Sequence, residues 1–417
     1  MRFDTLTVHF AQDPDPTTGS LTTPLVATST FVQDEPGVHR GFDYARSNHP
    51  TRRTLETVLA ALEETEHCAV FASGLAAEQA ILQAFLRPGD RVLTGRDVYG
   101  GTFRLLEKVW RPLGVVSESV DYADPAARAA ALKTPARIVW IESPTNPRLD
   151  VVDLAAVAAE ARAAGALVVV DNTFASPVNQ RPFRLGADLV VHSATKYLAG
   201  HSDLIQGAVL AKDAETFAPI KFLQNATGAT PSAFDCWLTL RGLKTLGLRV
   251  ARHNSNAQAV AEFLARRPEV SRVRYPGLAT DPGHAIAKTQ MRGFGGVVSV
   301  ELLATAAETR AFVSERRYFK LAESLGGVKS LVAYPAAMTH ASIPAEERRA
   351  RGLSDTLVRL SCGVEDPEDL IEDLQEGLSR LASSRPSVGR LEDAMAKTAA
   401  TGAAAAESAP KTTSSGR

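Results

Sequence analysis

Short apolar runs alternate with amphipathic segments through the first half of the chain. The apolar runs are typical of buried strands and lie at 68–72, 91–94, 115–120, 137–141, 167–170 and 188–192. Between them, segments 75–86, 102–113 and 153–164 have helical periodicity. Strands and helices in alternation predict an α/β fold, with a mainly parallel sheet and helices on both faces.

The segment before this region has a different pattern. Residues 1–50 are rich in proline, threonine, aspartate and glycine and have little helical periodicity, so we expect an extended arm. Apolar positions over 51–67 have the spacing of a helix with one buried face. We therefore assign residues 1–50 to an N-terminal arm that reaches a neighbouring subunit and residues 51–248 to a large domain.

The second half of the chain predicts a smaller α+β domain over 249–382. A helical bridge at 231–248 leads into it. Its expected elements are helices at 253–266, 305–315 and 367–381 and strands near 272–275, 296–302 and 357–360. Residues 383–417 are rich in small and polar residues and have few large apolar ones, so we expect a disordered tail.

Composition and charge narrow the class of protein. The 417 residues carry a net charge of −1, and no basic or apolar stretch points to a nucleic acid or a membrane partner. The 3 cysteines and the scattered histidines lack metal-ligand spacing, so we expect no metal site and no disulfide framework. The N-terminus lacks the apolar core of a signal peptide, which predicts a cytoplasmic protein.

Two residues at the ends of predicted strands carry the most specific chemistry. Lys196 follows an apolar strand and two hydroxyl residues, and Asp171 directly follows another strand. A lysine amine forms a Schiff base with an aldehyde, and an acid can keep a pyridinium nitrogen charged. This pair is what pyridoxal 5'-phosphate (PLP) requires. A solvated surface lysine is the ordinary alternative.

A phosphate site is predicted at the segment Phe71–Ala77. It has the order strand, glycine turn, helix, and Gly74 would let the backbone come close to an anion at the helix N-terminus. Ser193 and Thr195 would add hydroxyl donors. Taken alone, the segment is also compatible with an ordinary strand-to-helix turn.

Four more positions are candidates for contacts with the ring or with a substrate. Tyr99 precedes a diglycine turn and would stack on a pyridine ring, with a buried structural tyrosine as the alternative. Asn146 lies in a proline-rich turn and could bond a ring oxygen or a carboxylate, unless the turn is purely structural. Arg359 is a lone cation between apolar residues and would bind a carboxylate, with an edge-strand arginine that faces water as the alternative. Ser324, in a glycine-rich loop, would assist them.

Three further residues extend this set. Glu323, beside Ser324, would meet an amine at the far end of a substrate. In the N-terminal arm, Tyr44 and Arg46 could bind a phosphate, and the arm could carry them to a neighbouring subunit. Structural roles in a loop and in a solvated arm are the alternatives.

These segments, taken in order, resemble the Cys/Met-metabolism PLP enzymes, the trans-sulfuration group within fold-type I. The resemblance covers roughly residues 5–382 and is carried by Tyr44–Arg52, Ala72–Ala76, Val98–Thr102, Glu142–Pro147, Asp171–Thr173, His192–Tyr197 and Glu323–Gly327. It implies a seven-stranded sheet of the PLP-dependent transferase type with a smaller C-terminal domain. It also implies a homotetramer, built as a dimer of dimers that share active sites.

The resemblance implies a role for each candidate residue. Lys196 binds the cofactor aldehyde and later carries protons, Asp171 pairs with the pyridinium nitrogen, and Tyr99 stacks on the ring. The remaining residues divide into two groups by ligand. The phosphate is held by Gly74, Leu75, Ser193 and Thr195, with Tyr44 and Arg46 of the partner subunit, and the substrate by Arg359, Ser324, Asn146 and Glu323.

The resemblance favours an enzyme that acts at Cγ of cystathionine or O-acylhomoserine in methionine and cysteine metabolism. Glu323 is typical of cystathionine γ-lyases and γ-synthases, whereas Lys329 stands where many of them have glutamate and where sulfhydrylases of the family can have lysine. Cystathionine β-lyase and O-acylhomoserine sulfhydrylase are therefore alternatives within the family. A nucleotide-dependent protein is disfavoured because neither GxGxxG nor GxxxxGK[ST] occurs. A non-catalytic interaction protein on the same fold is a more distant possibility.

Overall fold

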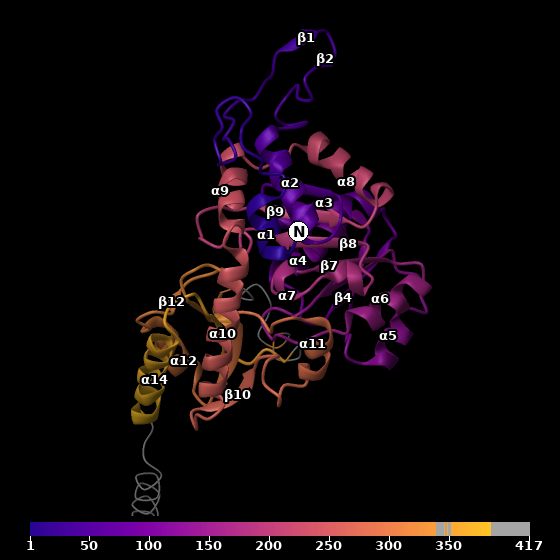
Figure 1. Ribbon diagram of the computed structural model, residues 1–417. Helices are drawn as coiled ribbons and strands as arrows, with labels where there is room; N and C mark the ends of the chain where they lie inside the picture. Colours follow the sequence, from indigo (N-terminus) through magenta and orange to yellow (C-terminus); the bar gives the residue numbers. More distant parts are fainter. Residues whose placement is uncertain (339–345, 347, 349–351, 385–417) are drawn as a thin grey trace, which may run out of the picture.

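The protein is described here as a computed structural model, which covers residues 1–338, 346, 348 and 352–384 (Figure 1). From residue 385 onward, the tail that we expected to be disordered lies outside the described residues. The first two residues of the predicted tail, 383 and 384, instead belong to the last turn of helix α14 (Pro367–Ser384).

A seven-stranded sheet forms the centre of the molecule. Its strands lie in the spatial order β3 (His67–Phe71), β9 (Gly207–Ala211), β8 (Leu189–Ser193), β7 (Leu167–Asp171), β6 (Ile138–Glu142), β4 (Arg91–Gly95) and β5 (Val116–Val120). The five strands from β8 to β5 are parallel. The α/β class and the mainly parallel sheet are therefore confirmed.

Both faces of this sheet are covered, which explains the unbroken apolar runs of its strands. One face packs against α2 (Pro50–Leu62), α6 (Leu154–Ala163) and α9 (Ala233–Leu243). The other face packs against α3 (Gly74–Phe85), α8 (Ala214–Thr227) and a π-helical segment, Leu105–Trp110. The remaining helical elements of this region are α4 (Gly100–Arg104), Arg111–Leu113, α5 (Pro125–Ala131), α7 (Ser176–Asn179) and Pro182–Leu185.

Strand β9 was missing from the sequence prediction. It is antiparallel to both neighbours, with Gly207 paired to Phe71 on one side and to Ser193 on the other. A side chain at Gly207 is excluded, since its Cβ would lie 2.1 Å from the carbonyl oxygen of Ser73. The strand therefore holds the end of β8 close to the start of α3.

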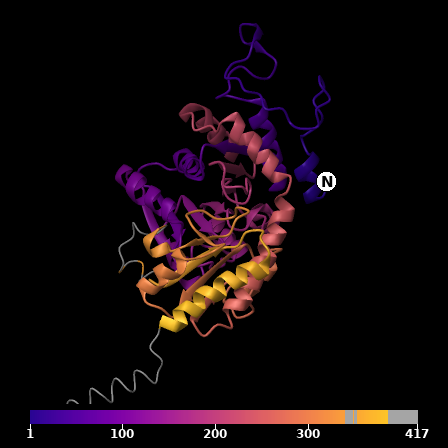
Figure 2. The same cartoon turned by 90° about the vertical axis from the view of Figure 1, so that its left-hand side faces the viewer.

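A five-stranded sheet forms the second, smaller core. Its strands lie in the order β10 (Val270–Arg274), β11 (Val297–Leu302), β14 (Leu357–Ser361), β13 (Leu331–Ala333) and β12 (Lys320–Leu321). Its helical elements are α10 (Leu246–Leu264), α11 (His284–Gln290), α12 (Ala306–Ser314), Pro335–Ala337 and α14. Figure 2 shows α14, in yellow, lying along these orange strands.

Helix α10 joins the two cores. Leu246 and Val250 at its start are buried with the large sheet, whereas Val260 and Leu264 are buried with the small one. The boundary that we predicted at residue 248 therefore falls inside a helix, and the division into domains stays a prediction.

The N-terminal segment contains more structure than expected. Residues Phe3–His9 form helix α1, which packs on α2 and α10. A short hairpin of β1 (Gln33–Glu35) and β2 (Val38–His39) then extends away from the body (Figure 1). Exposed apolar side chains on this segment include Leu21, Val32 and Val38. The contact of the arm with a neighbouring subunit stays a prediction.

Candidate active site

The carboxyl ends of three parallel strands bring the central acids together. Glu142 ends β6, Asp171 ends β7 and Ser193 ends β8. Parallel strands place these ends at one edge of the sheet, where open α/β sheets bind ligands. Lys196 follows β8 by one turn, in which its N–H donates to the Ser193 carbonyl at 3.1 Å.

The Lys196 amine is held by the small domain. Its Nζ donates to Ser324 Oγ at 2.8 Å. Burial and, to a smaller extent, the Arg359 cation lower the pKa of Lys196 to about 8, against an opposing effect of Glu323. The shift makes the uncharged amine, which is the nucleophilic form, available near neutral pH.

Asp171 keeps some solvent exposure at the end of its strand. Thr173 donates its backbone N–H to Asp171 Oδ1 at 2.9 Å. Desolvation raises the pKa of Asp171, and Thr173 and the nearby His192 oppose that rise. A cation placed against this carboxylate would relieve the desolvation penalty.

The predicted phosphate site is a narrow cup at the start of α3. Ser73 caps the helix by accepting the Ala76 N–H at 3.0 Å. A Cβ at Gly74 would lie 3.0 Å from Ser193 Cβ, so the helix and β8 are in contact there. The Thr195 hydroxyl already donates to the Gln206 carbonyl at 3.1 Å and accepts the Gln206 N–H at 2.9 Å.

Arg359 forms the centre of the candidate carboxylate site. It is 2% exposed, and burial lowers its pKa to about 10. Its Nη1 donates to Asn146 Oδ1 at 2.7 Å, and its Nη2 donates to the Ser324 carbonyl at 2.9 Å. Its Nε is buried without a hydrogen-bond partner, which leaves a donor for an anion. Asn146, Ser324, Arg359 and Lys196 thus form one connected group.

Tyr99 lies at the start of α4. Its backbone N–H donates to Glu142 Oε2 at 2.9 Å. Its ring fills the space beside Gly101, where a Cβ would lie 2.3 Å from Tyr99 Cε1. Burial raises the pKa of Tyr99, and the charges of Glu78 and Glu323 raise it further.

The sequence of this chain matches a known family over nearly its whole described length. The profile described as Cys/Met metabolism PLP-dependent enzyme matches residues 4–379. The chain belongs to this family. It is therefore a PLP-dependent enzyme of fold-type I, and the family, fold and cofactor predictions are confirmed.

Relatives within the family have different reactions. A cystathionine gamma-synthase of Mycobacterium tuberculosis is 51% identical over 90% of this chain and 96% of its own. A cystathionine beta-lyase of Coxiella burnetii is 49% identical over 90% of this chain and 97% of its own. The crystal structure of cystathionine gamma synthase from Xanthomonas oryzae pv. oryzae in complex with cystathionine has a TM-score of 0.90, with 46% identity over 92% of this chain and 100% of its own.

The side chains of this family member fit its cofactor. The Gly74 turn lies close to Ser193, with 3.0 Å between a Cβ added at Gly74 and Ser193 Cβ, and its glycine suits a backbone cup for phosphate. Two buried polar atoms of the candidate site, Glu142 Oε1 and Arg359 Nε, have no hydrogen-bond partner. Within the described ranges, no cluster of His, Cys, Asp and Glu side chains suits a metal ion. Nor does any helix there combine the length and apolar character needed to cross a bilayer.

Within one chain, the contacts of Tyr44 and Arg46 are with residues other than Lys196. Arg46 Nη1 donates to the Asn225 carbonyl at 2.8 Å and to its side-chain oxygen at 2.9 Å. The Arg46 guanidinium carbon also lies 5.6 Å from the centroid of the Tyr44 ring. These contacts place the pair beside α8. A role at the lysine requires a second subunit and stays a prediction.

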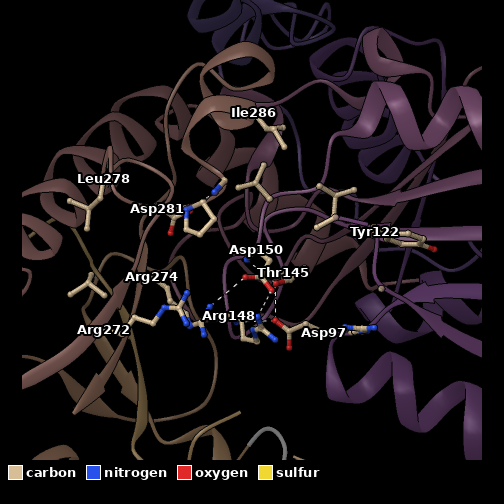
Figure 3. A pocket seen from close by; sticks show the side chains of 18 of the residues that line it. Asp97, Tyr122, Thr145, Arg148, Asp150, Arg272, Arg274, Leu278, Asp281 and Ile286 are labelled. Carbon is tan, nitrogen blue, oxygen red and sulfur yellow. Dashed lines mark hydrogen bonds and ion pairs between the residues drawn. The ribbon is translucent and has the colours of Figure 1, made fainter. Parts of the chain in front are cut away.

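A cavity of about 620 Å³ is lined by Thr145 and Arg148, which flank Asn146 in its loop (Figure 3). Lys196 does not line it. On its wall, Asp97 accepts from Thr145 Oγ1 at 2.7 Å and from the Arg148 N–H at 3.0 Å. Asp97 therefore anchors this loop, and the cavity borders the candidate active site without being part of it.

Sequence reasoning missed a buried polar network behind the strand ends. Asn172 Nδ2 donates to Glu63 Oε1 at 2.8 Å, and His192 Nε2 lies 2.7 Å from the same oxygen. Gln180 Nε2 donates to Asn172 Oδ1 and to the Ser143 carbonyl, both at 3.0 Å. The network ties the ends of β7 and β8 to the Asn146 loop. In the sequence, the signal for this network was that Asn172 and His192 lie inside two of the segments that carry the family resemblance.

Arg104 is a second missed residue. It is exposed at the end of α4, and its charge acts on Tyr99, as does that of exposed Glu323. A cation and an anion at exposed positions therefore have opposite effects on the pKa of Tyr99. The sequence signal that could have identified Arg104 is its position five residues after Tyr99.

Proposed function

We propose that the chain is a trans-sulfuration enzyme that acts at Cγ of O-acylhomoserine or cystathionine, and that cystathionine γ-synthesis is its main reaction. The observation that carries the proposal is the connected group of Lys196, Ser324, Arg359 and Asn146 beside Asp171. Such a group binds an α-amino acid and exchanges a proton at its α-carbon. The 51% identity to a cystathionine gamma-synthase favours that reaction.

Each side chain has a physical task in this proposal. PLP, when bound, supplies an electron sink for the α-carbon of the substrate. Asp171 holds a proton on the ring nitrogen, and Tyr99 packs on the ring face. Gly74, Leu75 and Ser193 offer the phosphate donors. Thr195 would join them only if its hydroxyl turned away from Gln206.

Arg359 and Asn146 fix the substrate carboxylate through charge and hydrogen bonds. The Lys196 amine then takes the α-proton and delivers protons to later atoms. Ser324 orients that amine by accepting its hydrogen bond. General base catalysis by a positioned group of this kind contributes about 10²–10⁴-fold.

Charges at the entrance are suited to the far end of a substrate. Glu323 and Arg104 have opposite charges, and both act on Tyr99. We propose that Glu323 binds a distal ammonium group and Arg104 a distal carboxylate. Cysteine and cystathionine carry both groups, which favours them over a simple thiol.

β-Lyase chemistry is a second candidate, because a relative with 49% identity is a cystathionine beta-lyase. γ-Lyase and sulfhydrylase activities also remain alternatives, the latter because of exposed Lys329. A non-catalytic role is disfavoured by the intact group around Lys196. We further propose a cytoplasmic homotetramer in which Tyr44 and Arg46 complete the phosphate site of a partner subunit.

The deciding experiment supplies the purified holoenzyme with O-acylhomoserine and cysteine, and separately with cystathionine alone. Cystathionine as the product of the first mixture supports γ-synthesis. Homocysteine with pyruvate from the second would instead establish β-lyase chemistry, and cysteine with 2-oxobutyrate would establish γ-lyase chemistry. A further mixture containing sulfide in place of cysteine tests the sulfhydrylase reaction. No turnover in any mixture would contradict an enzymatic role.

A further inference from the structure

Arg249 is a buried cation whose hydrogen bonds, within the described part of the chain, all go to uncharged oxygen atoms. It lies on α10 and is 6% exposed. Burying a charge without an opposite charge costs stability, so the position of Arg249 calls for an explanation. Its guanidinium group donates to the carbonyls of Tyr197 at 2.8 Å, Leu198 at 3.4 Å and Gly242 at 2.8 Å, and to Thr245 Oγ1 at 3.1 Å.

Two of these carbonyls belong to the residues that directly follow Lys196. Lys196 lies in an irregular turn, 194–199, after the end of β8. A turn of this kind leaves carbonyl groups without a regular partner, and a buried carbonyl group must be hydrogen-bonded. Tyr197 and Leu198 are each 2% exposed, so the Arg249 guanidinium takes the place of water as the donor.

The turn also fits closely around the guanidinium group. It is followed by Gly200, whose N–H donates to the Lys196 carbonyl at 2.8 Å and whose φ is 75°. A Cβ at Gly200 would overlap the Arg249 guanidinium. The glycine therefore allows the arginine to lie directly against the backbone that carries Lys196.

The loop that carries Ser324 docks on the same turn. The Gly200 carbonyl accepts the Val328 N–H at 3.0 Å. Ser324 Oγ accepts the hydrogen bond from Lys196 Nζ at 2.8 Å. Arg249 therefore supports the backbone of Lys196 and, through its contact with Gly200, the loop that holds the Lys196 amine.

We infer that Arg249 is a positioning residue for Lys196, because it fixes the turn from which the amine reaches the cofactor. Its planar fork of N–H groups serves several carbonyls at once, which the compact ammonium group of a lysine cannot do. The inference rests on the proposed role of Lys196 as the residue that binds PLP. It does not depend on which trans-sulfuration reaction the enzyme performs.

The test measures how fast the apoprotein captures PLP covalently, in Arg249→Lys and in the matched control Arg252→Lys. Arg252 is exposed on the same helix and donates to the Glu365 carbonyl at 3.2 Å. We expect Arg249→Lys to slow capture by about tenfold or more, since a small displacement of a reacting group strongly reduces its reactivity. In the PLP-loaded variant, kcat should fall with KM nearly unchanged, because Arg359 and Asn146 stay in place. Arg252→Lys should follow the wild type in each measurement.

A chemical rescue separates positioning from a general loss of stability. Arg249→Ala leaves a buried space beside the turn, and N-ethylguanidinium, added below the concentration that unfolds the protein, should fill it and restore much of the capture rate. Lys196→Ala should capture no PLP covalently with or without this additive. Covalent capture by Lys196→Ala would count against the role of the lysine, which distinguishes that failure from a failure of the Arg249 inference.

Two results would overturn the inference. One is capture by Arg249→Lys at the wild-type rate, because the fork of N–H groups would then be dispensable. The other is a capture rate of Arg249→Ala that does not rise when N-ethylguanidinium is added. If Arg249→Lys does not fold, the rescue of Arg249→Ala decides between the two readings of Arg249.

Discussion

At the scale of single residues, the surroundings of Lys196 set its chemistry. The side chain is a flexible amine in sequence terms, but Ser324, from a distant part of the chain, accepts its hydrogen bond. Burial and the Arg359 cation lower its pKa. An amine made neutral near pH 8 can act both as a nucleophile and as a base. Two predictions follow directly from this environment.

Replacement of Lys196 by alanine should abolish the absorbance of covalently bound PLP. Turnover should fall by roughly 10³-fold or more, because both the attachment point and the proton carrier are lost. The absorption spectrum and a product assay measure these effects. Lys212→Ala, at an exposed position, serves as the control and should retain both. Turnover at the wild-type rate in Lys196→Ala would refute the assignment.

Covalent capture of PLP by the apoprotein should accelerate as pH rises and level off above about 8. Below that pH the amine is protonated and cannot attack an aldehyde. Stopped-flow absorbance gives the rate at each pH. Arg359→Met removes a neighbouring cation, so the pKa of Lys196 should rise and the profile should move to higher pH. A profile that stays in place would show that the two groups do not interact.

At the scale of elements, loops between strands and helices carry the candidate site. The Asn146 loop is held from the cavity side by Asp97, and from the core side by Gln180. Burial raises the pKa of Asp97 to about 6, so it accepts hydrogen bonds as a carboxylate at neutral pH. The position of Asn146, which we propose binds the substrate carboxylate, therefore depends on residues outside the group around Lys196.

Asp97→Ala should loosen this loop and misplace Asn146. We expect KM for the amino-acid substrate to rise about tenfold, with the absorbance of bound PLP unchanged, since small displacements of positioning groups reduce reactivity strongly. Steady-state kinetics measure the effect. Asp121 also lies on the cavity wall, but it pairs with exposed Arg96 and not with the Asn146 loop. The Asp121→Ala variant is therefore the control and should behave like the wild type. Equal KM values for both variants would contradict the anchoring role.

Gly101→Ala tests the packing of α4. Its added Cβ would overlap the Tyr99 ring, at 2.3 Å from Cε1, so the ring must shift. We expect weaker PLP binding and a displaced absorption maximum. Thr102→Ala, at the next position, removes an unpartnered hydroxyl without adding bulk and should bind PLP nearly as the wild type does. An unchanged absorption spectrum in Gly101→Ala would contradict the proposal that the Tyr99 ring stacks on PLP.

At the scale of the whole molecule, the N-terminal arm leaves Tyr44 and Arg46 beside α8 rather than at the lysine of their own chain. The arm also exposes apolar side chains that favour burial against another surface. Both observations agree with sites shared between subunits.

Mixing two inactive variants tests shared sites. Arg46→Ala and Lys196→Ala subunits, refolded together, should regain roughly a quarter of wild-type activity, because each mixed dimer contains one intact site. Activity is measured before and after mixing. Each variant refolded alone is the control. If no activity returns although mixed oligomers form, Arg46 acts within its own chain or not at all.

The sequence alone determined the α/β class, most strands of the central sheet, the cofactor and the residues at the strand ends. These depend on local patterns: apolar runs, glycine turns, and a lysine and an aspartate that follow strands. Parallel pairing then places strand ends together without further information. Strand β9 was not predicted because its short run Gly207–Ala211 has no helical crossover before it. Its antiparallel pairing also depends on contacts distant in sequence.

Only the tertiary structure decided what surrounds these residues. Asn146, Ser324 and Arg359 are distant in sequence, and their hydrogen bonds arise because the fold places strand β14 of the small sheet beside the loop that follows β6 of the large one. Burial, which sets the pKa of Lys196 and of Asp97, is a property of tertiary packing and not of any local pattern. Residue types thus specify which chemistry is available, whereas proximity and desolvation, created by folding, specify where and at what pH it operates.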